Sequence, residues 1–235
     1  MSPAHARGVV RILRTRAVLT PRVLRACAAL GCCVRRGRAD PARLIGARAA
    51  ARALHRVLAP GHIAWISGPS GAGKSTLLRA LAAEARARRG RVLRPPSALA
   101  ASAARAVIDL VPGPLDDALA ALARAGLADA ALLVRTPSEL SEGERARLAL
   151  AWAFARTRAD GRRALLLLDE FASTLDRPAA CRAARALRRW ASRTGLRVVV
   201  ATAHDDLAPH LVADWRVRCA DNAWGVPIRA GGDPS

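Results

Sequence analysis

From His62 onward, short runs of apolar residues alternate with longer segments in which apolar residues recur every three or four positions. The short runs predict strands buried on both faces, and the longer segments predict amphipathic helices. The predicted strands cover residues 63–67, 91–93, 106–110, 164–168 and 196–202, and the predicted helices cover 74–89, 115–125, 142–156 and 178–190. Strands and helices in this alternating order predict an α/β fold with a parallel sheet.

The two ends of the chain have weaker patterns. Residues 23–34 and 41–58 have helical character, with Asp40 as a candidate N-cap and Pro41 at the first helical position. The residues beyond Trp224 are rich in Gly and Pro, so we expect little order there. Neither end contains a motif that indicates a chemistry.

Arginine supplies 38 of the 39 basic residues, and the single lysine is Lys74. A chain so rich in Ala and Arg is typical of a GC-biased coding sequence, so the formal net charge of +21 says little about partners. The exception at Lys74 is informative, because an ammonium is a compact point charge that a guanidinium cannot replace.

The N-terminal 60 residues are strongly basic, with 13 arginines and one acid, Asp40, which gives a net charge of +12. Such an arm could contact nucleic acid, an anionic lipid surface or an acidic protein face. It could equally be a solvated surface, since this stretch lacks Phe and Tyr, which would stack on nucleic-acid bases. Both interpretations remain open.

The longest uncharged run in the arm, residues 26–34, has nine residues. A transmembrane helix needs roughly 20, so we expect none there, and the scattered arginines fit a signal peptide poorly. An Arg-rich transit peptide stays an alternative to a cytoplasmic location. We expect the cytoplasm, because five cysteines without a CxxC pair suit a reducing compartment.

Three of the cysteines, Cys27, Cys32 and Cys33, are close together in the sequence. A structural zinc site would need four ligands at loop spacing, and His5 is the one further candidate nearby. The cysteines are therefore interpreted as buried small apolar residues.

One segment matches GxxxxGK[ST] between a predicted strand and a predicted helix, which is the context that this phosphate-binding loop requires. It comprises Gly68, Pro69, Ser70, Gly71, Ala72, Gly73, Lys74, Ser75 and Thr76. Its glycines let backbone N–H groups point at phosphate oxygens, and the helix N-terminus adds its positive dipole end. Lys74 would reach the β- and γ-phosphates, and Ser75 would ligate magnesium. The alternative is a Gly-rich turn without a ligand.

Two acids, Asp169 and Glu170, follow the apolar strand predicted over residues 164–168. Beside a phosphate loop, the first can hold magnesium and the second can polarise an attacking water. Exposed acids commonly follow buried strands, so this pattern gains its meaning from the loop.

A capping box opens the helix predicted over 142–156, with Ser141 as the cap and Glu144 three residues later. The box alone explains these residues as a helix start. Alternatively, a helix N-terminus that carries Ser141 and Gly143 offers a second phosphate clamp, useful if it faces a nucleotide on another subunit.

These segments resemble, in order and roughly in spacing, the nucleotide-binding domain of ATP-binding-cassette (ABC) ATPases, in the P-loop NTPase superfamily. GPSGAGKST resembles the Walker A loop, LSEGE the signature, LLLLDE the Walker B strand, residues 173–176 the D-loop, and Ala203-His204-Asp205 the H-loop. The resemblance implies an ABC-type ATPase core with a short helical subdomain. We expect that domain over residues 55–222, a basic segment over 1–54 and a C-terminal tail over 223–235.

The resemblance also implies roles for individual residues. Glu170 is the catalytic base, His204 contacts the γ-phosphate, and Lys74 with the loop binds phosphate. Ser75 and Asp169 serve magnesium. Ser141, Gly143 and Asp176 belong to motifs that meet ATP in a head-to-tail homodimer, so ATP and Mg²⁺ are the expected cofactors.

The chain departs from the family pattern in ways that affect its function. It has no glutamine, so the Q-loop residue that couples to membrane partners in the family is missing, and we expect Asp109 or Gly113 in that region. It has no tyrosine, so the residue that stacks on adenine is unassigned. Some runs resemble stand-alone soluble ABC ATPases.

The sequence therefore predicts a soluble, dimeric, Mg-dependent ATPase. Two alternatives stay open. One is an ATP-binding regulatory module with little turnover, and the other is the ATPase subunit of a transporter with a separate membrane subunit. The biological process and the role of residues 1–54 do not follow from the sequence.

Overall fold

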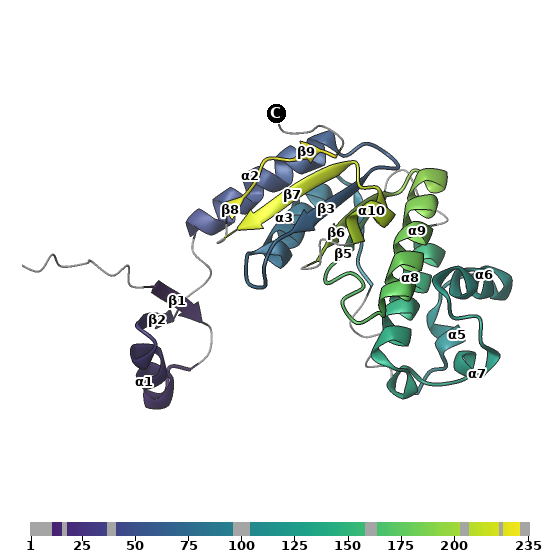
Figure 1. Ribbon diagram of the computed structural model, residues 1–235, viewed down its shortest axis with the longest axis horizontal. Helices are drawn as coiled ribbons and strands as arrows, with labels where there is room; N and C mark the ends of the chain where they lie inside the picture. The colour runs from purple at the N-terminus through teal and green to yellow at the C-terminus, as the bar shows by residue number, and fades with distance from the viewer. Residues whose placement is uncertain are drawn as a thin grey trace, which may run out of the picture. The chain divides into compact units, whose positions relative to one another are not determined.

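A computed structural model describes residues 11–15, 18–36, 41–95, 104–157, 164–202, 207–220 and 223–230 (Figure 1). The chain divides into two compact units, Met1–Ile45 and Gly46–Ser235. The domain boundary expected between residues 54 and 55 stays a prediction, and helix α2 (Pro41–Val57) runs across that position.

The first unit contains β1 (Arg11–Thr15), α1 (Pro21–Ala29) and β2 (Cys32–Arg36), and its two strands pair in parallel. The helical character expected over residues 23–34 is thus only partly correct. Gly31 adopts φ +63°, a left-handed value that glycine reaches freely, and the chain leaves the helix there for a strand. Cys33 is exposed and Cys27 is half-buried, so these cysteines are not the buried apolar residues expected.

The second unit is built on a mainly parallel sheet with the strand order β4–β5–β6–β3–β7–β8. Its strands are β3 (Ile63–Ser67), β4 (Arg91–Leu93), β5 (Ala164–Leu168), β6 (Arg197–Ala201), β7 (Trp215–Ala220), β8 (Ala223–Trp224) and β9 (Ile228–Arg229). Strands β4, β5, β6, β3 and β7 are parallel neighbours, whereas β8 and β9 pair antiparallel with β7. The predicted α/β fold with a parallel sheet is confirmed.

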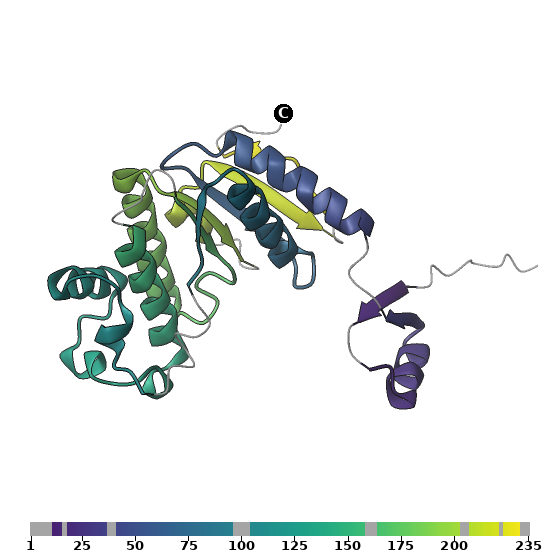
Figure 2. The ribbon, with the colours of Figure 1, turned by 180° about the vertical axis from the view of Figure 1, so that it is seen from behind.

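Helices cover both faces of this sheet. Helices α2 and α3 (Lys74–Ala87) lie side by side on one face, as Figure 2 shows, and α8 (Glu142–Thr157) and α9 (Arg177–Thr194) pack against the other. Strand β5 is covered on both faces. Leu165 and Leu167 pack in the core beside α2 and α3, and Leu166 and Leu168 pack in the core beside α8 and α9. Two buried faces explain why its sequence is an uninterrupted apolar run.

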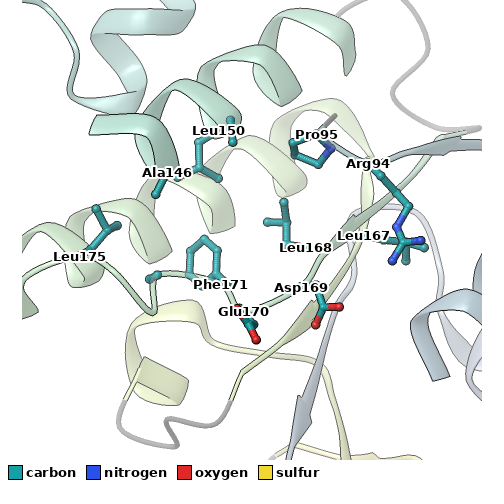
Figure 3. Close-up of a pocket in the computed structure, with 12 residues that line it drawn as sticks. Arg94, Pro95, Ala146, Leu150, Leu167, Leu168, Asp169, Glu170, Phe171 and Leu175 are labelled. Carbon is teal, nitrogen blue, oxygen red and sulfur yellow. The ribbon is translucent and has the colours of Figure 1, made fainter. Parts of the chain in front are cut away.

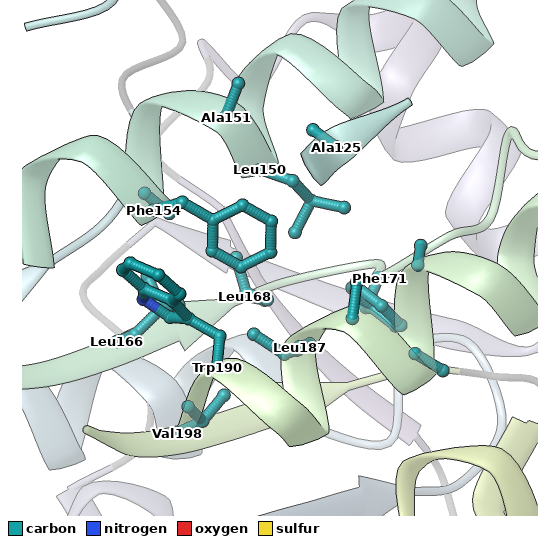
Figure 4. Close-up of a cluster of buried hydrophobic side chains, with 14 of the residues drawn as sticks. Ala125, Leu150, Ala151, Phe154, Leu166, Leu168, Phe171, Leu187, Trp190 and Val198 are labelled. Atoms are coloured by element: carbon teal, nitrogen blue, oxygen red, sulfur yellow. The ribbon is translucent and has the colours of Figure 1, made fainter. Parts of the chain in front are cut away.

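Three aromatic residues, Phe154 of α8, Trp190 of α9 and Phe171, lie among smaller apolar side chains in the core between these helices and the sheet (Figure 4). The rings of Phe154 and Trp190 lie 5.4 Å apart between centroids, with an interplanar angle of 54°. The Trp190 indole Nε1 donates to the hydroxyl of buried Thr157 at 2.7 Å, so the one polar atom of this ring is satisfied. The ring contact and this hydrogen bond join α8 to α9.

A small helical subdomain follows β4. It contains α5 (Val107–Leu110), α6 (Leu115–Ala125), α7 (Ala130–Leu133) and the 3-10 helix η1 (Pro137–Glu139). The strand expected over residues 106–110 is wrong, because a run of five residues fits a helical turn as well as a strand. Val107 is buried within the helix, and Val111, also buried, follows it with the extended backbone at which the helix ends.

The segment after β6 contains α10 (Ala208–Leu211), which leads into β7. Beyond Trp224, where little order was expected, Ile228–Arg229 instead form β9 and pair with β7. The Ala230 backbone N–H donates to the Asp214 carbonyl at 2.9 Å, which fixes the end of β9 beside the start of β7.

Candidate functional site

The phosphate loop leaves β3 at Ser67 and enters α3 at Lys74, in the strand–loop–helix context that the sequence predicts. Gly68 has φ +142° and Gly73 has φ +92°, both in the region that favours glycine. A Cβ at Gly68 would lie 2.1 Å from the Cys219 carbonyl oxygen, so any other residue there would displace β7. Gly68 is required by the close approach of the β7 backbone, and Gly73 by its left-handed conformation.

The Lys74 ammonium lies across the mouth of the loop. Its Nζ donates to the carbonyl oxygens of Gly68 at 2.6 Å and Pro69 at 2.9 Å. Lys74 and Ser75 are also the first residues of α3, so their backbone N–H groups have no acceptor within the helix. The loop thus combines one cation with free donors at a helix N-terminus, which is the chemistry of phosphate binding.

Asp169 and Glu170 are exposed directly after β5, as expected for acids that follow a buried strand. Strands β5 and β3 are parallel with β6 between them, so their carboxyl ends lie at one edge of the sheet. Two strand spacings place the strand axes about 10 Å apart. The sheet therefore brings the two acids and the phosphate loop to the same edge.

Glu170 has an unusual backbone, with φ +50°, in the left-handed region. Such a conformation is uncommon for a residue other than glycine. The turn is held by hydrogen bonds on both sides, from Phe171 N–H to the Ala201 carbonyl at 3.0 Å and from Ser173 N–H to the Glu170 carbonyl at 3.1 Å. The turn fixes the backbone of Glu170 just beyond the strand.

A cavity of about 430 Å³ adjoins these acids (Figure 3). Asp169, Glu170 and Phe171 line it from the turn after β5, and Ala146 and Leu150 line it from α8. Figure 3 also shows residues after β4, namely Arg94 and Pro95, at its margin. Asp109 and Gly113, which the sequence suggested near the Q-loop region, line a different cleft.

The capping box predicted at the start of α8 is confirmed. The Ser141 backbone N–H and hydroxyl donate to the Glu144 carboxylate at 2.7 and 2.8 Å, and the Glu144 N–H donates to Ser141 Oγ at 3.2 Å. The bond from the Ser141 N–H is the main cause that holds the pKa of the Glu144 carboxyl below its ordinary value. A charged Glu144 therefore fixes this helix end.

The segment 173–176 lies against this helix end within one chain. Thr174 Oγ1 donates to the Glu142 carbonyl at 3.5 Å, and a Cβ on Gly143 would lie 3.5 Å from the Thr174 carbonyl oxygen and from Leu175 Cδ2. These are ordinary contact distances, so packing does not require glycine at position 143. Asp176 caps α9, with its Oδ1 accepting from the Ala179 N–H at 2.7 Å.

The structure thus gathers the expected residues into two groups. Gly68, Lys74, Ser75 and the acids lie at one sheet edge, while Ser141, Gly143 and the 173–176 segment form a second cluster at the start of α8. His204 lies outside the described residues. Within the described ranges, no group of three or more His, Cys, Asp or Glu residues could hold a metal ion, and no helix is long and apolar enough to cross a bilayer.

Sequence reasoning missed one contact of the loop. Trp224 Nε1 donates to the Gly73 carbonyl at 3.2 Å, although 151 residues separate them in the chain. Trp224 stands in a Gly/Pro-rich stretch, and no local pattern relates it to the loop. A bulky aromatic within a segment otherwise typical of turns is the one signal that could have drawn attention to it.

Comparisons with known proteins agree with this arrangement. The ABC transporter family matches residues 52–173. The zinc import ATP-binding protein ZnuC of Ruegeria pomeroyi is 35% identical over 176 residues, which cover 69% of this chain. The match spans 65% of that relative's length.

Solved structures share the fold at lower sequence identity. The dimeric structure of MJ0796, a bacterial ABC transporter cassette, superposes with a TM-score of 0.60 and 20% identity, and the match covers 74% of this chain and 88% of the cassette. The archaeal ribosome recycling factor aABCE1, in complex with the stalk protein aP1, gives a TM-score of 0.56 and 23% identity over 74% of this chain and 40% of that one. Because the family match covers just over half of its residues and the fold agrees, the chain belongs to the ABC transporter family, as an ABC-type nucleotide-binding domain of the P-loop NTPase superfamily.

Proposed function

We propose that this chain binds ATP with Mg²⁺ and hydrolyses it to ADP and phosphate. The observation that carries the proposal is the meeting of the phosphate loop and the acids Asp169 and Glu170 at one edge of the parallel sheet. Ligands of open α/β sheets bind outside the carboxyl ends of the strands, where these groups lie.

The loop and Lys74 would hold the phosphates. The loop residues Gly68, Pro69, Ser70, Gly71, Ala72, Gly73, Ser75 and Thr76 wrap the anion, and the N–H groups at the start of α3 donate to it. Lys74 already offers its ammonium at the loop mouth, on carbonyls that a phosphate would replace as partners. Ser75 and Asp169 supply a hydroxyl and a carboxylate, which are hard oxygen ligands of the kind that magnesium takes.

Glu170 would act as the base that takes a proton from the attacking water. Its carboxylate is exposed at the end of β5, and the fixed turn that contains it keeps it beyond the strand. Magnesium, when bound, offsets the charge on the phosphates. We assign His204 the contact with the γ-phosphate, on its place after β6 in the chain order of the family.

The start of α8 supports a dimer in which each copy completes the site of the other. Ser141 is exposed and Gly143 is half-buried at this helix N-terminus. Packing within the chain would allow a Cβ at position 143, so we attribute the glycine to the close approach of a ligand. Asp176 ends the 173–176 segment, of which Thr174 and Leu175 contact this helix end. The MJ0796 cassette, which shares the fold, is dimeric.

The Glu170→Gln variant tests the proposal. Loss of a general base costs roughly 100-fold or more in turnover, while an amide of the same shape leaves ATP binding intact. We expect this result in a steady-state phosphate-release assay paired with a binding titration. Unchanged turnover would remove Glu170 from the mechanism.

Lys74→Arg is the comparison variant, since it keeps the charge at the loop but changes its shape. Unlike Glu170→Gln, it is expected to weaken both ATP binding and turnover. If wild type bound ATP tightly without measurable turnover, the chain would be a nucleotide-controlled regulatory module instead of an ATPase.

The ZnuC likeness favours a second candidate, the ATPase subunit of a transporter with a separate membrane subunit. Against it, the chain has no glutamine that could serve as the Q-loop residue. The residues after β4 that line the cavity are Arg94 and Pro95 instead. Co-purification of the Glu170→Gln variant, with ATP bound, separates the candidates, because a transporter subunit would bring an integral membrane protein with it.

A further inference from the structure

The phosphate loop contacts one hairpin, formed by β7 and β8, at both of its ends. At the entrance, Gly68 lies so close to the Cys219 carbonyl that a Cβ would be 2.1 Å from its oxygen. At the exit, the Trp224 indole packs on Gly73, where a Cβ would be 3.1 Å from the ring atom Cζ2.

Cys219 and Trp224 are paired directly across β7 and β8. The two ends of the loop therefore rest on a single cross-strand pair. The neighbouring Gly225 N–H donates to the Arg218 carbonyl at 2.9 Å, which continues the pairing beyond Trp224. A paired support of this kind resists a change in the separation of Gly68 and Gly73.

The Trp224 ring is held on its other side as well. A Cβ on Gly46 of α2 would lie 3.1 Å from Cζ3 of the indole, so the ring lies between α2 and the loop. Its Nε1 donates to the Gly73 carbonyl at 3.2 Å. The Gly73 carbonyl in turn accepts from the Thr76 and Leu77 N–H groups at 3.0 Å, so the hairpin, the loop and the first turn of α3 meet at one oxygen.

We infer that Trp224 is a positioning residue for the phosphate loop, and that the β7–β8 hairpin sets the loop in its phosphate-binding shape. The inference rests on the proposed function and deepens it. It predicts that Trp224 contributes to binding of the phosphate chain of a nucleotide, because it acts on the loop and not on the base.

The test compares Trp224→Ala, Trp224→Phe and the control Trp215→Ala. Trp215 begins β7, the strand that pairs with β8, and its Nε1 donates to His62 Nδ1 at 3.3 Å, away from the loop. Mg-tripolyphosphate and Mg-ATP are titrated into each full-length variant. A lost hydrogen bond with lost packing corresponds to about tenfold or more in affinity, so Trp224→Ala is expected to weaken both ligands by the same factor.

Trp224→Phe keeps a ring between Gly46 and Gly73 but lacks the Nε1 donor, so its affinities are expected between those of wild type and Trp224→Ala. Trp215→Ala is expected to leave both affinities unchanged when the titrations are made well below the melting temperature of that variant. A loss of ATP affinity alone in Trp224→Ala would overturn the inference, because it would make Trp224 a contact of the base.

Hydrogen exchange gives a readout that needs no nucleotide. In Trp224→Ala, the amides of residues 68–77 are expected to exchange faster than in wild type, while Trp215→Ala leaves them unchanged. Equal exchange in all three proteins would overturn the inference. A wild-type chain that fails to bind ATP would instead sink the proposed function, since the exchange comparison stands apart from it.

Discussion

Cys219 shows how burial changes the acidity of a side chain. Its side chain is fully buried behind the phosphate loop, and this burial raises the pKa of the thiol to about 11, an effect that the nearby Lys74 charge only partly offsets. An ordinary thiol has a pKa near 8.5. Cys219 is therefore protonated throughout the physiological pH range.

We predict that Cys219 resists alkylation in the native chain. At pH 8 about one thiol in a thousand is ionised at such a pKa, and the thiolate is the reactive form. Exposed Cys33 is the control and should react readily. Peptide mass spectrometry after brief iodoacetamide treatment measures both, and labelling of Cys219 should appear only when denaturant opens the fold. Equal labelling of the two native thiols would contradict the burial.

At the scale of elements, the N-terminus of α9 depends on Asp176. Its carboxylate accepts from the Ala179 N–H, and Pro178 occupies the first turn. Asp176→Ala is expected to lower the free energy of unfolding by about 1 kcal/mol, the usual contribution of an N-cap. Urea denaturation measures the loss.

Asp176→Asn separates the cap from a role toward nucleotide, because asparagine caps helices as well as aspartate does. We expect wild-type stability in this variant. A lower ATP turnover at unchanged stability would then assign the carboxylate charge to the site, whereas a stability loss as large as that of alanine would argue against the cap.

Much of the element order could be predicted from the sequence, for physical reasons. Runs such as Ala164–Leu168 are apolar throughout because both faces of β5 are covered. Helix α9 ends at Gly195, because glycine readily adopts the left-handed conformation of the C-cap. The prediction of a strand at 106–110 was wrong because an apolar run of this length fits either a strand or a helical turn. The β2 strand at Cys32–Arg36 failed because its pairing with β1 is set by residues 21 positions away.

The site was predictable only in part. Lys74, Ser75, Asp169 and Glu170 lie in local motifs, so their chemistry could be predicted from spacing. The contact of Trp224 with Gly73 depends on the pairing of β7 with β3 and β8, which no local pattern encodes. The same holds for the left-handed turn at Glu170, since the fold around it imposes that conformation.

At the scale of the second unit, one guanidinium joins distant segments. Arg188 of α9 donates to the Gly61 carbonyl at 2.6 Å, to the Val212 carbonyl at 3.2 Å and to Asp214 at 2.8 Å. The same Asp214 oxygen accepts from the Ile63 N–H at 2.7 Å. This network ties the outer helix to the starts of β3 and β7.

Arg188→Ala is expected to lower the free energy of unfolding by about 2–4 kcal/mol, because it removes the donor to the part-buried Gly61 carbonyl and the ion pair with Asp214. The control is Arg182→Ala on the exposed side of α9, for which a change within about 0.5 kcal/mol is expected. Guanidinium titrations of both variants measure the difference. Equal stabilities would mean that water replaces the guanidinium without loss.

The close approach of Gly68 to Cys219 also has a consequence for the order of events during synthesis. The loop is made early, but the strand on which it rests lies about 150 residues later in the chain. A ribosome-bound chain would therefore carry the whole Walker A motif without a supported binding loop. Nucleotide capture should begin only after residues 215–224 have emerged, so ATP should not be a ligand that guides the folding of the earlier segments.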